Sequence, residues 1–494
     1  MKTLGSIDLL MMVLYFIILL YIGYRIMKAK KGSEAESFLA ADRNMNLLQT
    51  TSSTAASDLG GGFSIAMGGM GFTIGISGSW WIAVSALSAV MAAFLLVPKV
   101  KKWADAAKGL TTGDLFAQRF DEKTGFIAAI LVGISWFAFV GGQIVAGGKL
   151  VAGTMGMDIT TAIILSGAVV LAYTIMGGLK AVIYTDVFQM VILLIGIIFL
   201  IVPIGLVRVG GWSGLVEQLQ ASSETAKLLS WGNIGWKQGL NLFLATFPIW
   251  FISIAGFQRI IAAKDEKTAK YSFFLTGIPI EWPLFAIGTT LVGMFARVLM
   301  PGLVDSELAT PNMIVTLLPV GISGIVVAAY IAAVMSTADS CLMGPVAIFV
   351  NDVYKKRINP QADSAQLVKI GRYATLILGM LAIYVAYRVP SVLTVVLYAY
   401  TFGAAGLFFP MLGLLFWKRT TAVGAFWSIL LGGSSAIIWG PVLKEPAAIP
   451  NSYIGWAVSF LALVIISLLT QHSPDEDLKT FYPEKNNLGP DLAG

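Results

Sequence analysis

The chain has 494 residues, of which 57% are hydrophobic and only 12% charged, and its formal net charge is +6. Because a soluble chain of average composition is about a quarter charged, this composition indicates an integral membrane protein. It excludes an ordinary soluble enzyme, a disordered chain and a nucleic-acid-binding protein. The single histidine, His472, and the single cysteine, Cys341, exclude an intrachain disulfide, a zinc site and a Ser/His/Asp relay.

Stretches of about 20 apolar residues are long enough to cross a bilayer as helices. We predict thirteen such spans, at 6–27, 46–74, 80–98, 125–153, 158–177, 184–207, 238–258, 272–297, 312–350, 371–389, 391–417, 421–441 and 453–470. The first span is expected to be retained, because it lacks the basic region and the small-residue cleavage site of a signal peptide. The polar tail at 471–494 is expected to be poorly ordered.

Lysine and arginine gather on the cytoplasmic side of membrane proteins. If the N-terminus lies outside, most of the 33 lysines and arginines fall on cytoplasmic segments, which include 25–43, 99–123 and 259–270. The pattern therefore predicts a multi-pass protein of the cell inner (plasma) membrane, with the N-terminus outside and the C-terminus in the cytoplasm.

If five consecutive helices form a unit and the next five repeat it, the second unit must be upside down in the membrane, because five spans begin and end on opposite sides. Inverted repeats of this kind place the substrate site near the midplane of the membrane, between helices that are interrupted there. Two spans carry helix-breaking residues near their middles, at 55–62 in the first and at 246–248 and 253–256 in the second. We predict that both helices are broken and that the site lies between them.

Charged side chains within spans are costly and usually functional. Asp58 stands beside three glycines, where it could cap a broken half-helix or attract a cation. Asp186 could cap its helix, pair with Lys180, or bind an ion on the cytoplasmic path. Glu281 lies in mid-span between two prolines, where it could pair with another helix or face a cavity.

The densest polar cluster lies in span 312–350. At helical spacing, one face carries the small and hydroxyl side chains of Ala333, Ser336, Thr337 and Ser340. Together with carbonyl groups freed in a nearby broken helix, this face offers the oxygen ligands that suit a monovalent cation. The alternative is helix packing with hydroxyls bonded to their own helix. The face lacks the paired carboxylates of a divalent-ion site.

Aromatic side chains that could wall a solute site are Trp80, Trp81, Trp136, Trp250, Tyr398, Tyr400 and Phe402. For Trp80 and Trp81 we expect the aromatic belt at the membrane interface. Trp250, Tyr398 and Tyr400 could either line and gate a solute site or pack in the core. Because the chain has no phosphate-binding motif and no nucleotide domain, transport driven by ATP is excluded for this chain alone.

Several motifs together resemble those of the sodium/solute symporter family, which includes bacterial sodium/proline symporters. The motifs lie at 173–181, 185–189, 257–259 and 333–340. The resemblance covers essentially the whole chain. It implies an all-α integral membrane fold of the LeuT type, with about 13 transmembrane helices in a 5+5 inverted repeat plus one N-terminal and two C-terminal helices. The implied segments are an extra helix and cytoplasmic loop at 1–45, repeats at 46–207 and 238–417, an extracellular loop at 208–237, C-terminal helices at 418–470 and a cytoplasmic tail at 471–494.

The resemblance also implies a sodium site between the first and eighth core helices. Its ligands would be the backbone carbonyls of Ala56, Leu59 and Ala333 and the hydroxyls of Ser336 and Thr337. Some members bind a second cation, and the matching positions here are Asp186, Asp339 and Ser340. Asp339 stands where those members have a smaller polar residue, so the sodium stoichiometry stays open.

The proline carriers share the run at 56–61, so we expect a small zwitterion or carboxylate, with proline or another amino acid first. A sugar, a pantothenate-like carboxylate and a choline-like amine are alternatives, although Asp58 replaces the pocket tryptophan of the choline carriers. We expect substrate contacts from Ser57, Asp58, Gly60, Gly61, Trp136, Trp250, Ile254 and Tyr400. Ile254 departs from the proline carriers, which have a proline-containing motif near this position.

The sequence thus predicts a sodium-coupled symporter that imports a small organic solute by alternating access. It would have no enzymatic activity and no cofactor, and sodium would be the coupling ion. Its partners would be the solute, sodium and membrane lipid, with no nucleic acid, and a monomer would suffice. The rival hypotheses are proton coupling through Asp58, Asp186 or Glu281, and a solute sensor that does not transport.

Overall fold

The structure is a computed structural model that describes residues 4–28, 40–389 and 391–472. Over these ranges the chain is helical and forms no β-strand, although one isolated bridge joins Met45 to Ala263. Ten helices in the described ranges are long and apolar enough to cross a membrane, and two shorter apolar helices accompany them. The predicted all-helical membrane class is confirmed, and the count of thirteen spans stays a prediction. Most of the tail at 471–494 lies outside the described residues.

The first half of the chain begins with one helix apart from the rest and continues through two long helices. Its elements are α1 Ser6–Lys28, η1 Ala41–Arg43, α3 Leu47–Asp58, α4 Gly61–Ile74, η2 Gly75–Ser79, α5 Trp80–Leu95, α6 Val97–Ala107, α7 Thr112–Arg119, α8 Glu122–Met155, α9 Ile159–Leu193, η3 Leu194–Ile201 and α10 Val202–Arg208. A short helical segment then leads out of this half, formed by α11 Gly211–Gln220, α12 Ser223–Ala226 and η4 Lys227–Leu229.

The second half is again built from broken and long helices. Its elements are α13 Trp236–Thr246, α14 Ile249–Ile252, α15 Ile254–Ala262, α16 Glu266–Leu275, η5 Thr276–Phe285, α17 Ala286–Leu299, η6 Ser306–Leu308, α18 Ala309–Leu317, α19 Ile322–Ile348, η7 Phe349–Ile358, α20 Ser364–Arg388, α21 Val392–Phe416, α22 Ala422–Ile437, η8 Ile438–Val442, η9 Pro446–Ala448 and α23 Asn451–Leu469.

Both predicted helix breaks are present. The first helix stops at Asp58 and resumes at Gly61, with Leu59 and Gly60 between the two halves. The second helix stops at Thr246, forms the short α14, and is interrupted again at Ser253, whose backbone is extended. Gly60 is the residue before α4, so Asp58 ends α3 and the hypothesis that it caps the second half-helix is wrong.

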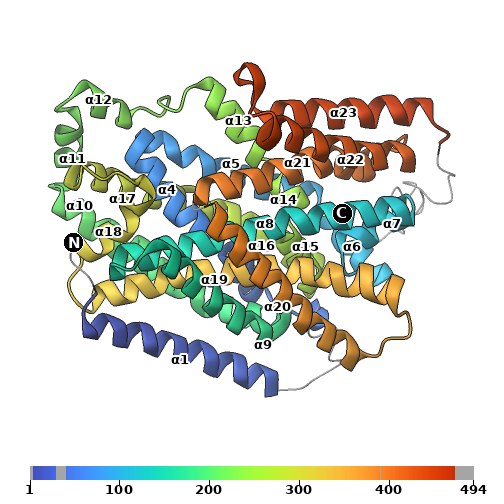
Figure 1. Cartoon of the computed structure of the whole chain (residues 1–494), viewed down its shortest axis with the longest axis horizontal. Coiled ribbons are helices and arrows are strands. Elements are labelled where there is room, and N and C mark those ends of the chain that lie inside the picture. Colours follow the sequence, from blue (N-terminus) through green and yellow to red (C-terminus); the bar gives the residue numbers. More distant parts are fainter. Residues whose placement is uncertain (1–3, 29–39, 390, 473–494) are drawn as a thin grey trace.

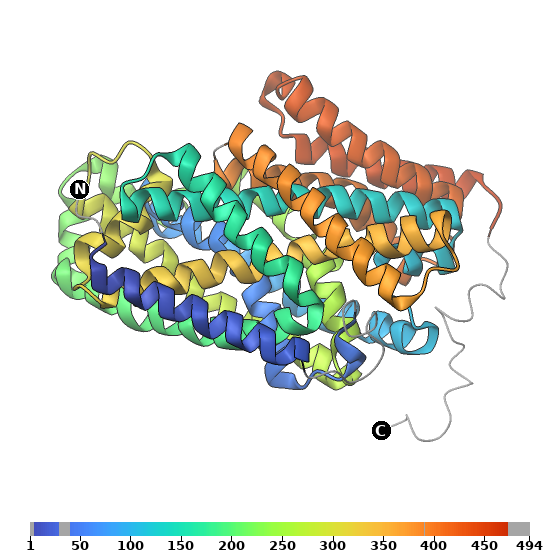
Figure 2. The same ribbon diagram turned by 60° about the horizontal axis from the view of Figure 1, so that its bottom comes forward.

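Helix α19 occupies the centre of the bundle. In its most apolar stretch of 18 residues, 94% is buried inside the molecule, compared with 33% for α23. This identifies α19 as a core helix. It packs against α3, α4, α8 and α9. Helix α1 lies along one side of the bundle and the α22–α23 hairpin along the other (Figures 1 and 2). Most side chains of α19 are therefore buried inside the bundle.

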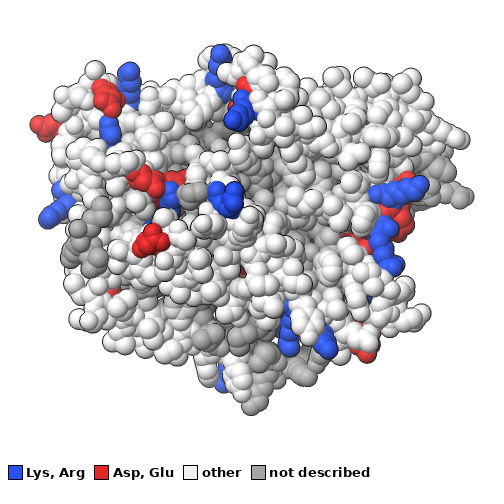
Figure 3. All heavy atoms as spheres, viewed as in Figure 1, with Lys and Arg blue, Asp and Glu red and all other residues white. Residues whose placement is uncertain are grey.

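Figure 3 shows one face of the molecule as a largely uncharged surface with only a few separate groups of charged side chains. Such a surface suits contact with lipid, because charged groups in the hydrocarbon layer carry a high free-energy cost. The face supports the membrane assignment made from composition.

Helix α1 is fastened to the start of α19 by one carboxylate. Asp8 Oδ1 accepts hydrogen bonds from the backbone N–H of Gly321 at 2.7 Å and of Gly324 at 2.8 Å, and from the Ser323 hydroxyl at 2.8 Å. The first backbone N–H groups of a helix have no partners within it, so Asp8 acts as an N-cap supplied by another helix. The contact explains how a helix outside the core is positioned against it.

We expect Asp8→Ala to lower the stability of the folded protein by about 1–2 kcal/mol, because the substitution removes a capping carboxylate. The thermal unfolding temperature of purified protein in detergent measures this loss, with Glu217→Ala as the exposed control. A variant with wild-type stability would show that α1 is held by other contacts.

Candidate ion and solute site

The break in the first helix meets the hydroxyl face of α19. Ser336 and Thr337 both donate hydrogen bonds to the carbonyl oxygen of Ala56, each at 2.9 Å. This carbonyl is available because the helix stops two residues later and no longer supplies a backbone donor to it. Ser336 also lies 3.2 Å from the Ala333 carbonyl. The freed carbonyl and the hydroxyl face therefore lie in direct contact, and their binding of an ion stays a prediction.

Leu59, the remaining predicted sodium ligand, lies in the same break, next to the predicted substrate residues Gly60 and Gly61. The Leu59 carbonyl accepts a long hydrogen bond from Ser64 at 3.4 Å. Gly60 approaches α19 so closely that a Cβ there would overlap Thr337, and a Cβ on Gly61 would overlap Val334. Only glycine allows the broken helix to sit this close to the hydroxyl face.

A buried ion pair lies nearby, between α9 and α15. The Arg259 guanidinium donates to Asp186 at 3.1 Å, and both side chains are fully buried. Arg259 also donates to Ser340 at 2.5 Å and to Ser53 at 2.9 Å, and the Ser53 hydroxyl bonds to Asp186. The residues Ser53, Asp186, Arg259 and Ser340, which we call the ionic network, tie together α3, α9, α15 and α19.

Two expectations from the sequence are wrong here. Asp186 pairs with Arg259 and neither caps a helix end nor pairs with Lys180, which pairs with Asp42 at 2.6 Å. Arg259, which was counted among the cytoplasmic surface charges, is completely buried. The charge pattern led to this error because the positive-inside rule counts every arginine near a membrane boundary. It does not distinguish an arginine in an exposed loop from one that is buried in the last turn of a helix, as Arg259 is.

All three residues of the possible second cation site lie at the ionic network. The Ser340 backbone N–H lies 2.6 Å from Asp339 Oδ1. Oδ1 of Asp186 and Oδ2 of Asp339 are buried without a hydrogen-bond partner in the part of the chain that the structure describes. The site thus has free carboxylate oxygens, but one cation, the Arg259 guanidinium, already lies within it.

Asp58 is held by a chain of hydrogen bonds from two other helices. Ser85 in α5 donates to Asp58 Oδ2 at 3.0 Å, and the Trp250 indole N–H in α14 donates to Ser85 Oγ at 3.0 Å. Both broken helices therefore contribute to this cluster, as an inverted-repeat site requires. Ser85 was not predicted, since a lone serine in an apolar span carries no recognisable signal.

Glu281 faces Asp58 across the same cluster. Its element η5 packs against α3 and α5, and its carboxyl interacts electrostatically with Asp58 and Ser85. The side chain is fully buried, and neither of its oxygens has a hydrogen bond of good geometry within the described residues. Of the two possibilities that the sequence left open, contact with other helices is the one that the structure forms.

An aromatic wall adjoins the break. Tyr400 stacks on Phe139 with ring centroids 5.1 Å apart, and lies 6.3 Å from both Trp136 and Phe63. Phe63 in turn packs on Trp81 at 4.8 Å. Trp81 is fully buried, so its predicted place in the interfacial belt is wrong.

Two aromatic residues predicted for the membrane face or the pocket point outward. Trp80 is 42% exposed, in keeping with the interface, and donates to the Trp231 carbonyl at 3.0 Å. Tyr398 is 46% exposed, so it does not line the cluster around Asp58. Of the predicted pair, only Tyr400 reaches the interior, because residues two apart on a helix face different directions.

The other predicted substrate residues fall into two groups. Trp136 stays with the aromatic wall and donates a long hydrogen bond to the Ile252 carbonyl at 3.4 Å. Ser57 instead turns toward the ionic network, where it bonds to Ser340 at 3.1 Å. Ile254 packs against Gly344 in α19. The structure therefore does not bring all eight predicted substrate contacts into one pocket.

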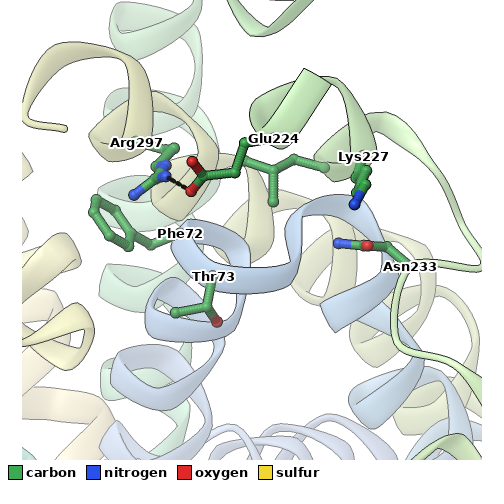
Figure 4. A pocket seen from close by; sticks show the side chains of 7 residues that line it. Phe72, Thr73, Glu224, Lys227, Asn233 and Arg297 are labelled. Atoms are coloured by element: carbon green, nitrogen blue, oxygen red, sulfur yellow. Dashed lines mark hydrogen bonds and ion pairs between the residues drawn. The ribbon is translucent and has the colours of Figure 1, made fainter. Parts of the chain in front are cut away.

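A cavity of about 360 Å³ lies at the far end of α4 from the break (Figure 4). It is lined by Phe72, Thr73, Glu224, Lys227, Leu228, Asn233 and Arg297. Arg297 pairs with Glu224 at 2.7 Å and lies over the Phe72 ring at 5.1 Å. The short helices after α10 thus reach across to α17 and cover this end of the bundle.

A second charged cluster lies beside α7, outside the spans. The Asp114 carboxylate accepts a hydrogen bond from Lys356 Nζ at 2.5 Å and another from the backbone N–H of Leu110 at 2.9 Å. Burial alone would raise the pKa of Asp114, but these hydrogen bonds keep it below the ordinary value of an aspartate. Asp114 is therefore ionised at neutral pH and links α7 to η7.

Comparison with known proteins decides the family. A model of the sodium:solute symporter family matches residues 38–432, which is most of the chain. The chain belongs to the sodium:solute symporter family. Membership makes it a sodium-coupled symporter of a small solute. The helix break, the hydroxyl face of α19 and the cluster around Asp58 are thus features of a transporter.

Several named bacterial relatives align with this symporter over nearly its whole length. The osmoregulated proline transporter OpuE of Bacillus subtilis (strain 168) is 26% identical, and the alignment covers 95% of this chain and 96% of OpuE. The high-affinity proline transporter PutP of the same organism is 28% identical over 92% of this chain and 96% of its own length. A sodium/proline symporter of Staphylococcus aureus (strain bovine RF122 / ET3-1) is also 28% identical, over 94% of this chain and 92% of its own.

Two solved structures share the architecture. A Na+-coupled sialic acid symporter in a substrate-bound outward-open state superposes with a TM-score of 0.74 at 20% identity, over 95% of this chain and 99% of that one. The nucleobase-cation-symport-1 family transporter Mhp1 superposes with a TM-score of 0.58 at 14% identity, over 91% of this chain and 99% of that one. At such identities the likeness shows the fold alone, which is the predicted LeuT type.

Proposed function

We propose that this symporter imports proline, or a closely related amino acid, together with sodium across the plasma membrane. The substrate assignment is supported by relatives named as proline transporters that align over more than nine-tenths of their own length. The single structural observation that carries the coupling is the contact of Ser336 and Thr337 with the freed carbonyl of Ala56.

We propose that sodium binds at this contact, held by the carbonyls of Ala56, Leu59 and Ala333 and the hydroxyls of Ser336 and Thr337. Both hydroxyls already lie within hydrogen-bonding distance of the Ala56 carbonyl oxygen, which would be a ligand of the same sodium ion. A monovalent ion does not require a carboxylate ligand. Bound sodium would fasten the broken helix to α19. Asp58 is the last residue before the break. Fixing the break would therefore raise the affinity for solute by linkage, and solute would raise the affinity for sodium equally.

The second cation site remains a proposal with an open stoichiometry. Asp186 and Asp339 offer unpartnered oxygens within the described structure, whereas the Arg259 guanidinium already supplies one positive charge there. We propose that the chain works with its N-terminus outside and its C-terminus in the cytoplasm, as the charge pattern predicts. We also propose that a monomer suffices and that no cofactor takes part.

Uptake by purified protein in liposomes tests the proposed function. We expect radiolabelled L-proline to accumulate when an inward sodium gradient is imposed and not when choline replaces sodium at fixed pH. Uptake that persists without sodium and follows a proton gradient would support the rival hypothesis of proton coupling. Sodium-dependent uptake of a sugar or of pantothenate in place of proline would overturn the substrate assignment.

We expect Ser336→Ala and Thr337→Ala each to raise the sodium concentration for half-maximal uptake roughly tenfold, because each removes one oxygen ligand to a charged partner. Ser428→Ala is the matched control. Ser428 is equally buried, but it bonds to Ser459 at 2.7 Å between α22 and α23. Wild-type sodium dependence in both site variants would refute the assignment.

A further inference from the structure

Glu281 is the least explained polar group in the core of the symporter. It is completely buried in η5, between two prolines in the sequence, and within the described structure its two oxygens have no hydrogen bond of good geometry. Its contacts are with the Asp58 carboxyl and the Ser85 hydroxyl, and no lysine or arginine is bonded to it within the described residues. A buried carboxyl group without a cation or well-placed donors is strongly disfavoured. Groups of this kind in a folded protein call for an explanation, and an absent ligand is one.

The neighbour of Glu281 is a second carboxyl group. Asp58 lies opposite it and is only 6% exposed. Its carboxyl accepts a hydrogen bond from the Ser85 hydroxyl and also interacts with the Glu281 carboxyl. Arg259, the guanidinium on the adjoining α15, is already bonded to Asp186, Ser53 and Ser340. Two carboxyl groups thus face each other at the helix break, with no lysine or arginine of the described chain bonded to them.

The surroundings of this pair favour an organic cation over a bare metal ion. Tyr400 lies close enough to interact electrostatically with both carboxyls, and its buried hydroxyl has no hydrogen-bond partner among the described residues. Its ring belongs to the aromatic wall with Phe139 and Phe63. Carboxylates beside an apolar aromatic surface match a solute that carries an N–H cation on a carbon skeleton.

We propose that Asp58 and Glu281 together bind the ammonium group of the transported solute, each accepting one N–H hydrogen bond. This inference rests on the proposed import of an amino acid and narrows it. A primary or secondary ammonium group has two or more N–H donors, enough for both carboxyls. A quaternary ammonium has none, and a sugar brings no charge, so the pair would select against both.

The test compares proline with analogues of similar size that lack the donors. In wild-type liposomes we expect L-proline to compete fully with labelled proline. Tetrahydrofuran-2-carboxylate, which has an oxygen in place of the nitrogen, and N,N-dimethylproline should compete roughly 10- to 100-fold less well, as expected for the loss of a charge-assisted hydrogen bond. Analogues that compete as well as proline would overturn the inference.

The variant Glu281→Gln keeps the shape of the side chain and removes its charge. We expect the KM for proline to rise roughly 10- to 100-fold, while the sodium concentration for half-maximal uptake stays within about twofold. Glu281→Asp, which keeps the carboxyl, should show a smaller rise. Glu224→Gln is the control, because that glutamate is 80% exposed by side chain and pairs with Arg297 away from the helix break.

Other outcomes separate the alternatives. An unchanged KM with an altered sodium dependence would assign the pair to a second sodium ion and overturn the inference. An unchanged KM with a lost pH dependence would assign the pair to a proton, which would also overturn the inference.

If Glu281→Gln does not fold, thermal stabilisation of wild-type protein by proline and by its two analogues still decides. If wild-type protein takes up no proline at all, the proposed function fails, and the same stabilisation assay with other primary and secondary amines tests the pair independently.

Discussion

Arg259→Met is expected to be the most destabilising single substitution in this symporter. It would leave Asp186 as a fully buried carboxylate without its cation, and would remove donors from Ser53 and Ser340. Breaking a buried ion pair by removing one partner costs about 3–5 kcal/mol, which is a large share of the stability of a typical protein. The loss should appear as a lower unfolding temperature in detergent and as poor yield of folded protein.

The double variant Asp186→Asn/Arg259→Met separates the charge from the packing. It removes both charges, so most of the lost stability should return, whereas transport should remain impaired because the four helices are no longer tied together. Arg297→Met is the control, since its pairing with the exposed Glu224 is worth at most about 1 kcal/mol. A single variant as stable as wild type would show that Asp186 is neutral or that water replaces the guanidinium.

The helix breaks and the hydroxyl face could be predicted because local sequence determines them. Three glycines after Asp58 and a proline at position 248 disfavour helix wherever they stand. The face formed by Ala333, Ser336 and Thr337 follows from helical spacing alone. The contact between these two features could then be predicted from the resemblance, which implies that the first and eighth core helices lie side by side.

The partners of buried charges could not be predicted in the same way. Arg259 follows Asp186 by 73 residues, and their contact depends on how α15 packs against α9. Arginine near a predicted membrane boundary was assigned to the surface by the positive-inside rule, which concerns loops. The contact between Asp58 and Glu281 could not be predicted for the same reason. Asp58, Glu281 and Ser85 lie on three separate elements, which only the packing of the helices brings together.

The error at Trp81 has a simpler cause. Consecutive residues on a helix are rotated by about 100° from each other, so two adjacent tryptophans need not share one environment. Trp80 is 42% exposed, whereas Trp81 is fully buried against Phe63. Helical periodicity applied to α5 would have indicated that one of the two faces the core.

Gly60→Ala is expected to weaken the binding of sodium. A Cβ at this position would overlap the side chain of Thr337 and the Gln143 amide oxygen. The overlap with Thr337 includes its own Cβ, which is fixed to the backbone, so a rotamer change cannot relieve it. The break must then move away from α19, which separates the Ala56 carbonyl from the hydroxyls of Ser336 and Thr337.

We therefore expect the sodium concentration for half-maximal uptake to rise more than about tenfold, with a loss of stability of about 1–3 kcal/mol from overpacking. Gly239→Ala is the matched control, because the nearest atom to its added Cβ is 3.8 Å away. Gly60→Ala/Thr337→Ser should not restore the wild-type sodium dependence, since serine keeps both the Cβ and the hydroxyl oxygen. Normal sodium dependence in Gly60→Ala would show that the ion does not need the close approach of the broken helix to α19, and would move the proposed sodium site elsewhere.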